Sequence, residues 1–182
     1  MPETSPILLI SGPPGAGKST VARLMVAASE TPIAYIEGDT FWKFIAKSRP
    51  AASNVEARHQ NGRIVVQAMV ASALRFARGG YETILDFTIG PWILTGLVPK
   101  LDLTPLNYVV ICPSEAVCAQ RARDRAEGKL SDYAQFHDLY IAFAQAGQLE
   151  SHYIRDDTAD AAALCATIRA GIKTGMYHVK AD

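Results

Sequence analysis

The stretch SGPPGAGKST, residues 11–20, determines how the rest of the chain is interpreted. It fits the spaced pattern G-x-x-x-x-G-K-[ST], whose fixed positions here are Gly12, Gly17, Lys18 and Ser19. A continuous apolar run, residues 7–10, precedes it and is typical of a strand buried on both faces. After it, apolar residues at positions 21, 24, 25 and 28 have the spacing of one helix face. Strand, glycine-rich loop and helix in this order predict a loop that binds nucleotide phosphates.

Each residue type in this loop has a chemical reason. The three glycines allow backbone conformations that are closed to other residues and let N–H groups approach phosphate oxygens. The helix that follows presents its positive dipole end to the anion. Lys18 would neutralise charge on the β- and γ-phosphates, and the Ser19 hydroxyl would ligate Mg²⁺. We therefore expect the nucleotide to be bound by Gly12, Pro13, Pro14, Gly15, Ala16, Gly17, Lys18, Ser19 and Thr20.

Length and composition set bounds on the class of protein. The chain has 182 residues, 18 of them basic and 18 acidic, so its formal net charge is +0. This length predicts a single domain over residues 1–182, and the lack of a basic excess argues against extended nucleic acid as a partner. No apolar run approaches ~20 residues, so we expect a cytoplasmic protein with no membrane partner. The three cysteines lack metal-site spacing and are expected to be buried thiols, and a monomer and a homodimer remain open.

Strand-like and helical patterns alternate along the chain. The predicted strands are residues 7–10, 33–36, 83–87, 106–111 and, weakly, 152–154. Helical patterns cover residues 66–77, 91–101, 114–126 and a last segment from about 158, and residues 174–182 are expected to be a loose tail. This alternation predicts an α/β fold with three α/β/α layers around a five-stranded parallel sheet. Ligands on such sheets bind at the carboxyl ends of the strands.

Carboxylates stand at two of these strand ends. Glu37 and Asp39 follow the second strand, where one could order the Mg²⁺ hydration shell and the other could accept a substrate proton. Asp39 could instead cap the next helix. Asp86 ends the third strand like a Walker B carboxylate, so it could hold a Mg²⁺ water or touch the acceptor. We assign Ser19, Glu37 and Asp86 to the metal, with the nearer of the two carboxylates left open.

Two arginines follow the fourth strand. Arg121 and Arg125 are four residues apart and so share one face of the predicted helix. A polar turn comes next, and residues 121–135 are predicted to form a short helical lid whose arginines clamp the nucleotide. Pairing of these arginines with Asp124 and Glu127 on a solvated helix is the alternative.

The segment from about 40 to 63 is expected to be irregular and to bind the acceptor. It follows the second strand and contains many basic and polar side chains. These would suit a phosphorylated, carboxylated or polyhydroxylated acceptor, although an ordinary polar surface connection has a similar composition. The residues predicted to contact the acceptor are Asp39, Trp42, Arg58 and Asp86.

These motifs together resemble the small P-loop kinases of small molecules, the group of gluconate kinases, shikimate kinases and chloramphenicol phosphotransferases. LISGPPGAGKST looks like their P-loop, and IEGDTFW looks like their D-G-D or D-x-D element, with Glu37 in place of the first aspartate. QRARDR resembles their lid arginine pair, and RDDTAD, residues 155–160, resembles the loop that borders the adenine. Departures occur after Asp39, where Phe41 and Trp42 stand instead of the gluconate kinase histidine and substrate loop.

The resemblance implies a P-loop NTPase fold and ATP with Mg²⁺ as cofactors. It implies that Asp39 is the base that activates the acceptor hydroxyl, that Arg121 and Arg125 meet the nucleotide, and that the adenine is flanked by Asp156, Asp157 and Thr158. The expected function is phosphoryl transfer from ATP to a small-molecule hydroxyl, with catalytic residues Lys18, Asp39, Arg121 and Arg125.

Other functions remain open at this point. The acceptor could be a nucleoside, a nucleotide or, as in zeta-toxin-like kinases, a sugar nucleotide. A nucleotide switch is disfavoured because residues 86–90 read D-x-x-x-G instead of D-x-x-G. A mechanical ATPase would usually need a further domain or a signature for acting across subunits. A protein that binds nucleotide without transferring phosphate is a fourth alternative.

Overall fold

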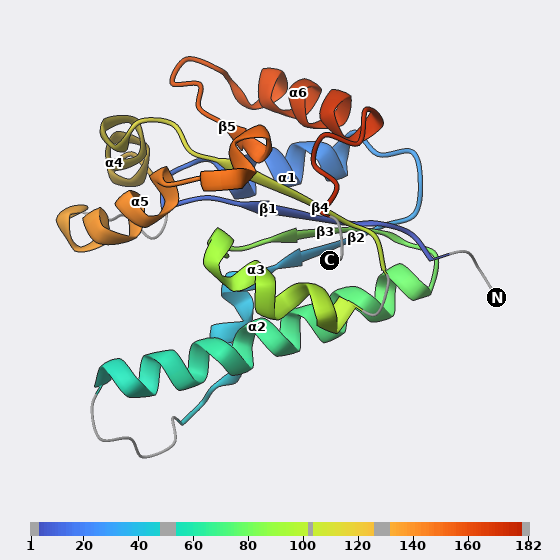
Figure 1. Ribbon diagram of the computed structural model, residues 1–182, viewed down its shortest axis with the longest axis horizontal. Helices are drawn as coiled ribbons and strands as arrows, with labels where there is room; N and C mark the ends of the chain where they lie inside the picture. Colours follow the sequence, from blue (N-terminus) through green and yellow to red (C-terminus); the bar gives the residue numbers. More distant parts are fainter. Residues whose placement is uncertain (1–3, 48–53, 102–103, 126–131, 180–182) are drawn as a thin grey trace.

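The computed structural model describes residues 4–47, 54–101, 104–125 and 132–179, and its elements surround one sheet (Figure 1). The strands are β1 (Ile7–Ser11), β2 (Ile33–Glu37), β3 (Glu82–Asp86), β4 (Leu106–Ile111) and β5 (Tyr153–Ile154). The α-helices are α1 (Lys18–Ala27), α2 (Asn54–Arg78), α3 (Pro91–Leu97), α4 (Glu115–Arg123), α5 (His137–Ala144) and α6 (Ala161–Lys173). Four 3₁₀ segments join them: η1 (Gly38–Phe44), η2 (Val98–Leu101), η3 (Ala134–Phe136) and η4 (Gly147–His152).

The sheet has five parallel strands in the order β2-β3-β1-β4-β5. β1 lies at its centre and pairs with both β3 and β4, so both of its faces are covered and all five of its residues are buried. Figure 1 shows α1 and α6 on one face and α2 and α3 on the other. The predicted three-layer α/β/α P-loop fold is therefore confirmed.

Alternating side chains of the strands build a separate core on each face. In β1, Ile7 and Leu9 pack toward the face covered by α2 and α3, whereas Leu8 and Ile10 pack toward α1 and α6. This alternation follows from the two-residue period of a strand. The continuous apolar runs seen in the sequence are the result, because each strand must supply side chains to two cores.

The loop between β1 and α1 fits closely against two other segments. Gly12 and Gly15 have φ angles of 142° and 80°. A Cβ at Gly12 would overlap the carbonyl oxygen of Ile111 at the end of β4, and one at Gly15 would overlap the carbonyl oxygen of Cys118 in α4. Glycine is therefore required at both positions for two reasons: the positive φ angle and the lack of space for a Cβ.

Two sequence predictions about local structure are wrong. The expected irregular segment includes η1 and the first ten residues of α2, whose sequence NVEARHQNGR carries no apolar stripe that would reveal a helix. The expected loose tail is ordered up to Val179: Tyr177 is buried, its carbonyl accepts from the N–H of Tyr108, and the N–H of Val179 donates to Leu106. Tyr177 of this segment completes the core on one face of the sheet. A single buried residue produces no periodic pattern, so the sequence did not indicate it.

Two helix ends differ by a few residues from the predicted ones, and the cysteines are as predicted. α4 ends at Arg123, three residues earlier than expected, and α6 begins at Ala161 after the capping side chain of Asp160. All three cysteines are buried and free. Among the helices in the described ranges, none combines the length and apolarity that crossing a membrane requires.

We predict that Gly15→Ala destabilises the protein far more than Gly175→Ala. Both glycines have left-handed φ angles, 80° and 73°, so both alanines incur about 1–2 kcal/mol of backbone strain. Only at Gly15 does the added Cβ also collide with backbone, since nothing lies within 4 Å of a Cβ at Gly175. We expect a total loss of roughly 2–5 kcal/mol for Gly15→Ala, measured by chemical denaturation. Equal losses would mean that the loop does not pack against α4 as described.

Candidate active site

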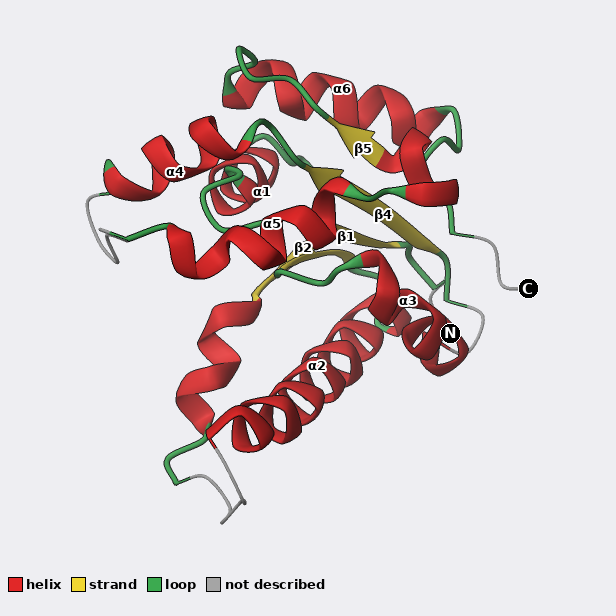
Figure 2. Ribbon diagram, turned by 60° about the vertical axis from the view of Figure 1, so that its left-hand side comes forward, coloured by secondary structure: helices red, strands yellow, loops and turns green. Residues whose placement is uncertain are grey.

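A cleft of about 1780 Å³ opens at the carboxyl ends of the strands. One end is formed by the β1–α1 loop, α4 and the start of α6, and the other by η1, α2 and α3. Figure 2 shows η1 descending from β2 beside α2. Most predicted site residues line this cleft: Pro14, Gly15, Gly17, Lys18, Ser19, Thr20, Glu37, Asp39, Trp42, Arg58, Asp86, Arg121 and Arg125.

The phosphate loop places Lys18 and Ser19 beside Asp86. The Nζ atom of Lys18 donates to the carbonyl of Pro13 at 3.1 Å. Burial lowers the pKa of Lys18, while the carboxylates of Asp86 and Asp39 oppose that shift. Burial also raises the pKa of Asp86, against a hydrogen bond from Ser19 and the charge of Lys18. A lysine, a hydroxyl and a carboxylate thus meet at the carboxyl end of β1 and β3, as expected.

Asp86 is further held by the neighbouring strand. The hydroxyl of Tyr35 in β2 donates to its Oδ2 at 3.2 Å, and only 4% of Asp86 is exposed. The position of its carboxylate is therefore fixed from both sides. A carboxylate held in this way beside the Ser19 hydroxyl is compatible with the predicted metal site, which remains a prediction.

Glu37 and Asp39 both line the cleft but have different surroundings. Glu37 accepts from Nη2 of Arg23 in α1 at 2.7 Å, and both side chains are largely exposed. Asp39 stands in the first turn of η1, makes no hydrogen bond to another described residue and lies within electrostatic reach of Lys18. Asp39 is therefore free to meet a ligand, whereas Glu37 already has a partner. The assignment of Glu37 to the metal remains a prediction.

The two lid arginines differ in how they are held. Arg121 donates to the carbonyl of Ala16 at 3.3 Å and to that of Ala159 at 3.5 Å, so it joins the phosphate loop to the segment before α6. Arg125 lies beyond the end of α4, which makes the expected shared helix face wrong in detail, yet it still lines the cleft. Of the predicted lid, residues 126–131 lie outside the described part of the chain.

The loop after β5 contributes different residues from those predicted. Asp157 accepts the N–H of Ser114 at 2.6 Å, and Asp156 accepts from the N–H and hydroxyl of Thr158. Neither Asp157 nor Thr158 is among the residues lining the cleft. The next residues line it instead: Ala159, Asp160 and Ala161. A role for Asp157 and Thr158 at the adenine therefore stays a prediction, as does a role for the backbone of Gly12, Pro13 and Ala16.

Two helical stripes form the walls of the other end. From α2 come residues 58, 59, 62, 63, 66 and 67, and from α3 and η2 come residues 92, 93, 96, 97 and 100. Each series has the spacing of one helix face. Sequence reasoning missed the second stripe, including Trp92 and Lys100. The available signal was the pair Gly90-Pro91, because proline is typical of the first helical position. It places the start of α3 directly after the loop at the end of β3, and so beside the cleft.

The fold and the cleft agree with the comparison to known families. A family profile described as an AAA domain matches residues 7–139, which include the phosphate loop, Asp39, Asp86 and both lid arginines. The chain belongs to this AAA-domain family. No curated protein sequence matches this AAA-domain protein significantly.

Solved structures with the same fold are similar over nearly the whole chain. A tunicamycin resistance protein from Deinococcus radiodurans is 16% identical, with a TM-score of 0.69 over 97% of this chain and 99% of that one. A sugar kinase from Janibacter is 17% identical (TM-score 0.63, 94% and 95%). A gluconokinase from Sinorhizobium meliloti is 16% identical (TM-score 0.61, 96% and 94%). The AAA-domain protein therefore has the P-loop kinase fold that the sequence motifs suggested.

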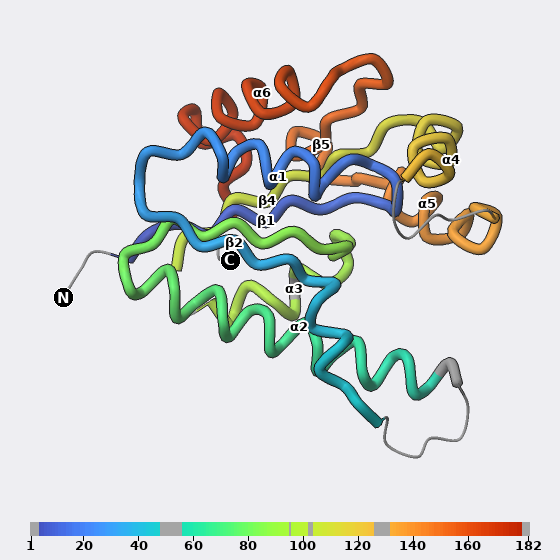
Figure 3. Tube along the Cα trace, turned by 180° about the vertical axis from the view of Figure 1, so that it is seen from behind, coloured from blue at the N-terminus to red at the C-terminus, as the bar shows by residue number. Residues whose placement is uncertain are grey.

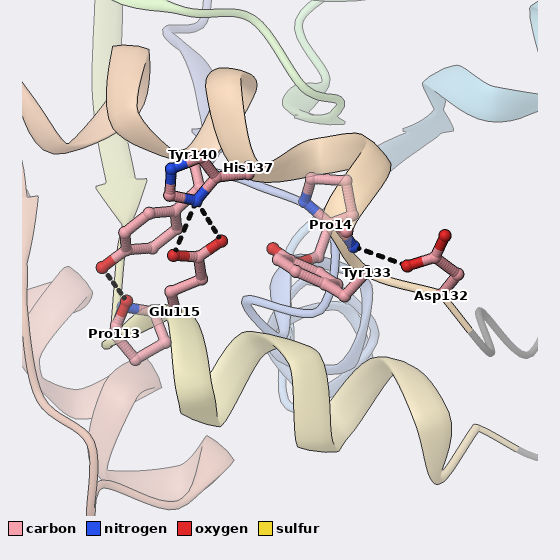
Figure 4. A network of polar contacts seen from close by, with 8 residues as sticks. Pro14, Pro113, Glu115, Asp132, Tyr133, His137 and Tyr140 are labelled. Atoms are coloured by element: carbon pink, nitrogen blue, oxygen red, sulfur yellow. Dashed lines mark hydrogen bonds and ion pairs between the residues drawn. The ribbon is translucent and has the colours of Figure 1, made fainter.

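Beyond the cleft, polar contacts link Tyr133 to the phosphate loop and α5 to α4 (Figure 4). The hydroxyl of Tyr133 donates to the carbonyl of Pro14 at 2.7 Å. His137 at the start of α5 contacts both carboxylate oxygens of Glu115 in α4, at 2.9 and 3.1 Å, and the hydroxyl of Tyr140 donates to Pro113. The segment that follows the lid is thus attached to both α4 and the loop.

We predict that the His137–Glu115 pair makes stability fall as pH rises. Its hydrogen bond and charge raise the pKa of His137 above about 6.5, so the pair stabilises the fold fully below that pH. The contribution disappears as pH rises through the raised pKa of the folded protein. His137→Gln and Glu115→Gln should each flatten the decline of unfolding free energy between pH 6 and 8, as measured by denaturant titration. An unchanged slope in either variant would contradict the pair.

Proposed function

We propose that this AAA-domain protein is an ATP-dependent phosphotransferase that acts on a hydroxyl group of a small molecule. The observation that carries the proposal is the continuity of the cleft. It runs from the phosphate loop to a second space between α2 and α3, and Asp39 lines it within electrostatic reach of Lys18. An ATPase that acts on water needs no such second space, whereas a kinase needs room for an acceptor.

The roles of the residues follow from their surroundings. Asp39 would take the proton of the acceptor hydroxyl as its oxygen attacks the γ-phosphorus, while the bond between that phosphorus and the β–γ bridging oxygen breaks and ADP leaves. Lys18 lies within electrostatic reach of Asp39 and Asp86. From this position its ammonium group would balance negative charge on the phosphates. Arg121 and Arg125 would add positive charge from the lid side, and closure there would exclude water.

The residues present fit a magnesium ion. Ser19 lies close enough to the buried carboxylate of Asp86 to lower its pKa, so a hydroxyl and a carboxyl group already lie together at the phosphate loop. In this arrangement Ser19 would ligate the ion and Asp86 would hold its water, with Glu37 as a further candidate. When bound, Mg²⁺ would neutralise the developing charge between the β- and γ-phosphates.

We predict that Asp39→Asn lowers acceptor-dependent turnover about 10²–10⁴-fold without changing ATP affinity, because only proton removal is lost. ADP formation from Mg-ATP would be measured across sugar acids, sugars, nucleosides, nucleotides, UDP-sugars and aminoglycoside- or chloramphenicol-type antibiotics. Asp138→Asn, an exposed aspartate of α5 outside the cleft, is the matched control. Basal hydrolysis that no acceptor raises would contradict the proposed transfer. Turnover that survives Asp39→Asn would show that another group is the base.

The two arginines should be separable by their effects. Arg121→Gln removes two backbone hydrogen bonds, so we expect a loss of about 1–3 kcal/mol in stability together with weaker ATP binding. Within the described residues Arg125 makes no hydrogen bond or ion pair, so Arg125→Gln should leave stability unchanged and lower kcat by about 10³-fold or more. Thermal unfolding beside steady-state kinetics tests both expectations. Unchanged kcat in Arg125→Gln would remove it from the catalytic set.

A further inference from the structure

The half of the cleft away from the phosphate loop contains positive charge without negative partners. Arg58 and Arg63 in α2 and Lys100 in η2 all line this half and are exposed. Within the described ranges, none of the three lies within ion-pair distance of a carboxylate. By contrast, Arg23, at the phosphate end of the same cleft, is paired with Glu37 at 2.7 Å.

Basic side chains also outnumber carboxylates among the described residues that line this half. Of the described residues that line it, Asp39 is the only carboxylate, and it faces the phosphate loop. The whole chain has a formal net charge of +0, so a local excess of cations is not a property of the composition. Cations gathered in a concave site attract anions and raise their local concentration.

Two arginines of α2 line this half of the cleft, Arg58 and Arg63. Arg63 follows Arg58 by five positions, which is about 7.5 Å along the helix and about 140° around it, so the two side chains enter the cleft from different edges of the lining face. At Gly62, between them, a Cβ would lie 3.6 Å from the ring of Trp42, so that ring covers the helix where a side chain is absent. Figure 3 shows η1, which carries Trp42, running alongside the first half of α2.

Both tryptophans of the chain line this cleft. Trp42 is 36% exposed and Trp92, across from it on α3, is 51% exposed. Trp92 packs edge-on against Phe143, with ring centroids 5.3 Å apart, and lies over Gly90, so its position is supported from behind. Supported aromatic faces beside arginines suit a ligand that combines a ring with an anionic group.

Building on the proposed function, we infer that the acceptor carries a phosphate or carboxylate group on a sugar or nucleoside framework. Arg58 and Arg63 bind the anionic group, and Trp42 and Trp92 contact the ring. The reacting hydroxyl then lies toward Asp39, on the side of the phosphate loop. Neutral counterparts of the same acceptor bind weakly because they leave the arginines without a partner.

The two tryptophans allow binding to be measured without turnover. Intrinsic fluorescence of the native protein would be titrated, with saturating Mg-ADP to occupy the phosphate loop, against matched anionic and neutral probes. The pairs are glucose 6-phosphate and glucose, gluconate and sorbitol, and UMP and uridine. We expect a saturable change for at least one anionic probe and at least tenfold weaker binding of its neutral counterpart. The pair that responds distinguishes phosphate from carboxylate and sugar from nucleoside.

Charge-removing variants locate the binding site. Arg58→Gln and Arg63→Gln should each raise the dissociation constant of that anionic probe about 10- to 100-fold, the effect of one charge-assisted hydrogen bond. Arg75→Gln, an exposed arginine of the same helix outside the cleft, should leave it unchanged. Because these measurements need no phosphoryl transfer, they support the inference even where ADP formation fails to respond.

Three results would overturn the inference. Equal binding of a neutral probe and its anionic counterpart would remove the charge requirement. Loss of binding that is the same in Arg75→Gln as in the cleft variants would show a general charge effect. Failure of every anionic probe to change the fluorescence would show that the site does not take this class. Phosphorylation of a neutral acceptor with unchanged KM in Arg58→Gln and Arg63→Gln would leave the proposed kinase standing and the anionic acceptor refuted.

Discussion

The close approach of the phosphate loop to two neighbouring backbone segments is the constraint on which the site depends. At Gly12 and Gly15, the loop backbone touches the last residue of β4 and Cys118 within α4 with no space for a side chain. Those contacts fix the loop relative to the central strands on one side and to the lid helix on the other. Since φ is positive at both glycines, the same residues also set the direction of the loop.

Carbonyl groups of that loop hold the lid side of the cleft. Ala16 accepts from Arg121 at the end of α4, and Pro14 accepts from Tyr133 just before η3. Arg121 and Tyr133 are therefore attached to nearby points of the loop. These hydrogen bonds connect both α4 and the residue before η3 to the loop backbone.

The sequence predicted the features whose signals are local. Strand, loop and helix around residues 7–28 are adjacent in sequence, and the strand-end carboxylate Asp86 follows its own apolar run, so pattern alone placed them correctly. The first half of α2 was missed because it packs little apolar surface, and the tail was missed because its order depends on contacts with β4. The hydrogen bond that Asp157 accepts from Ser114 joins residues 43 positions apart, a contact that no local pattern reveals, and the predicted role of Asp157 at the nucleotide remains a prediction.

In the half of the cleft away from the phosphate loop, the sequence predicted Trp42 and Arg58 but not Arg63, Trp92 or Lys100, for a related physical reason. The walls of that half come from α2 and α3. The sequence pattern of a helix does not show which of its polar faces lines a cleft. Which arginines of α2 enter the cleft is decided by the packing of Met69, Val70 and Ala73 against the sheet. That packing turns Arg58 and Arg63 inward to the cleft and leaves Arg75 outside it. The side chains that α2 presents to the cleft are therefore determined by the buried side of the helix.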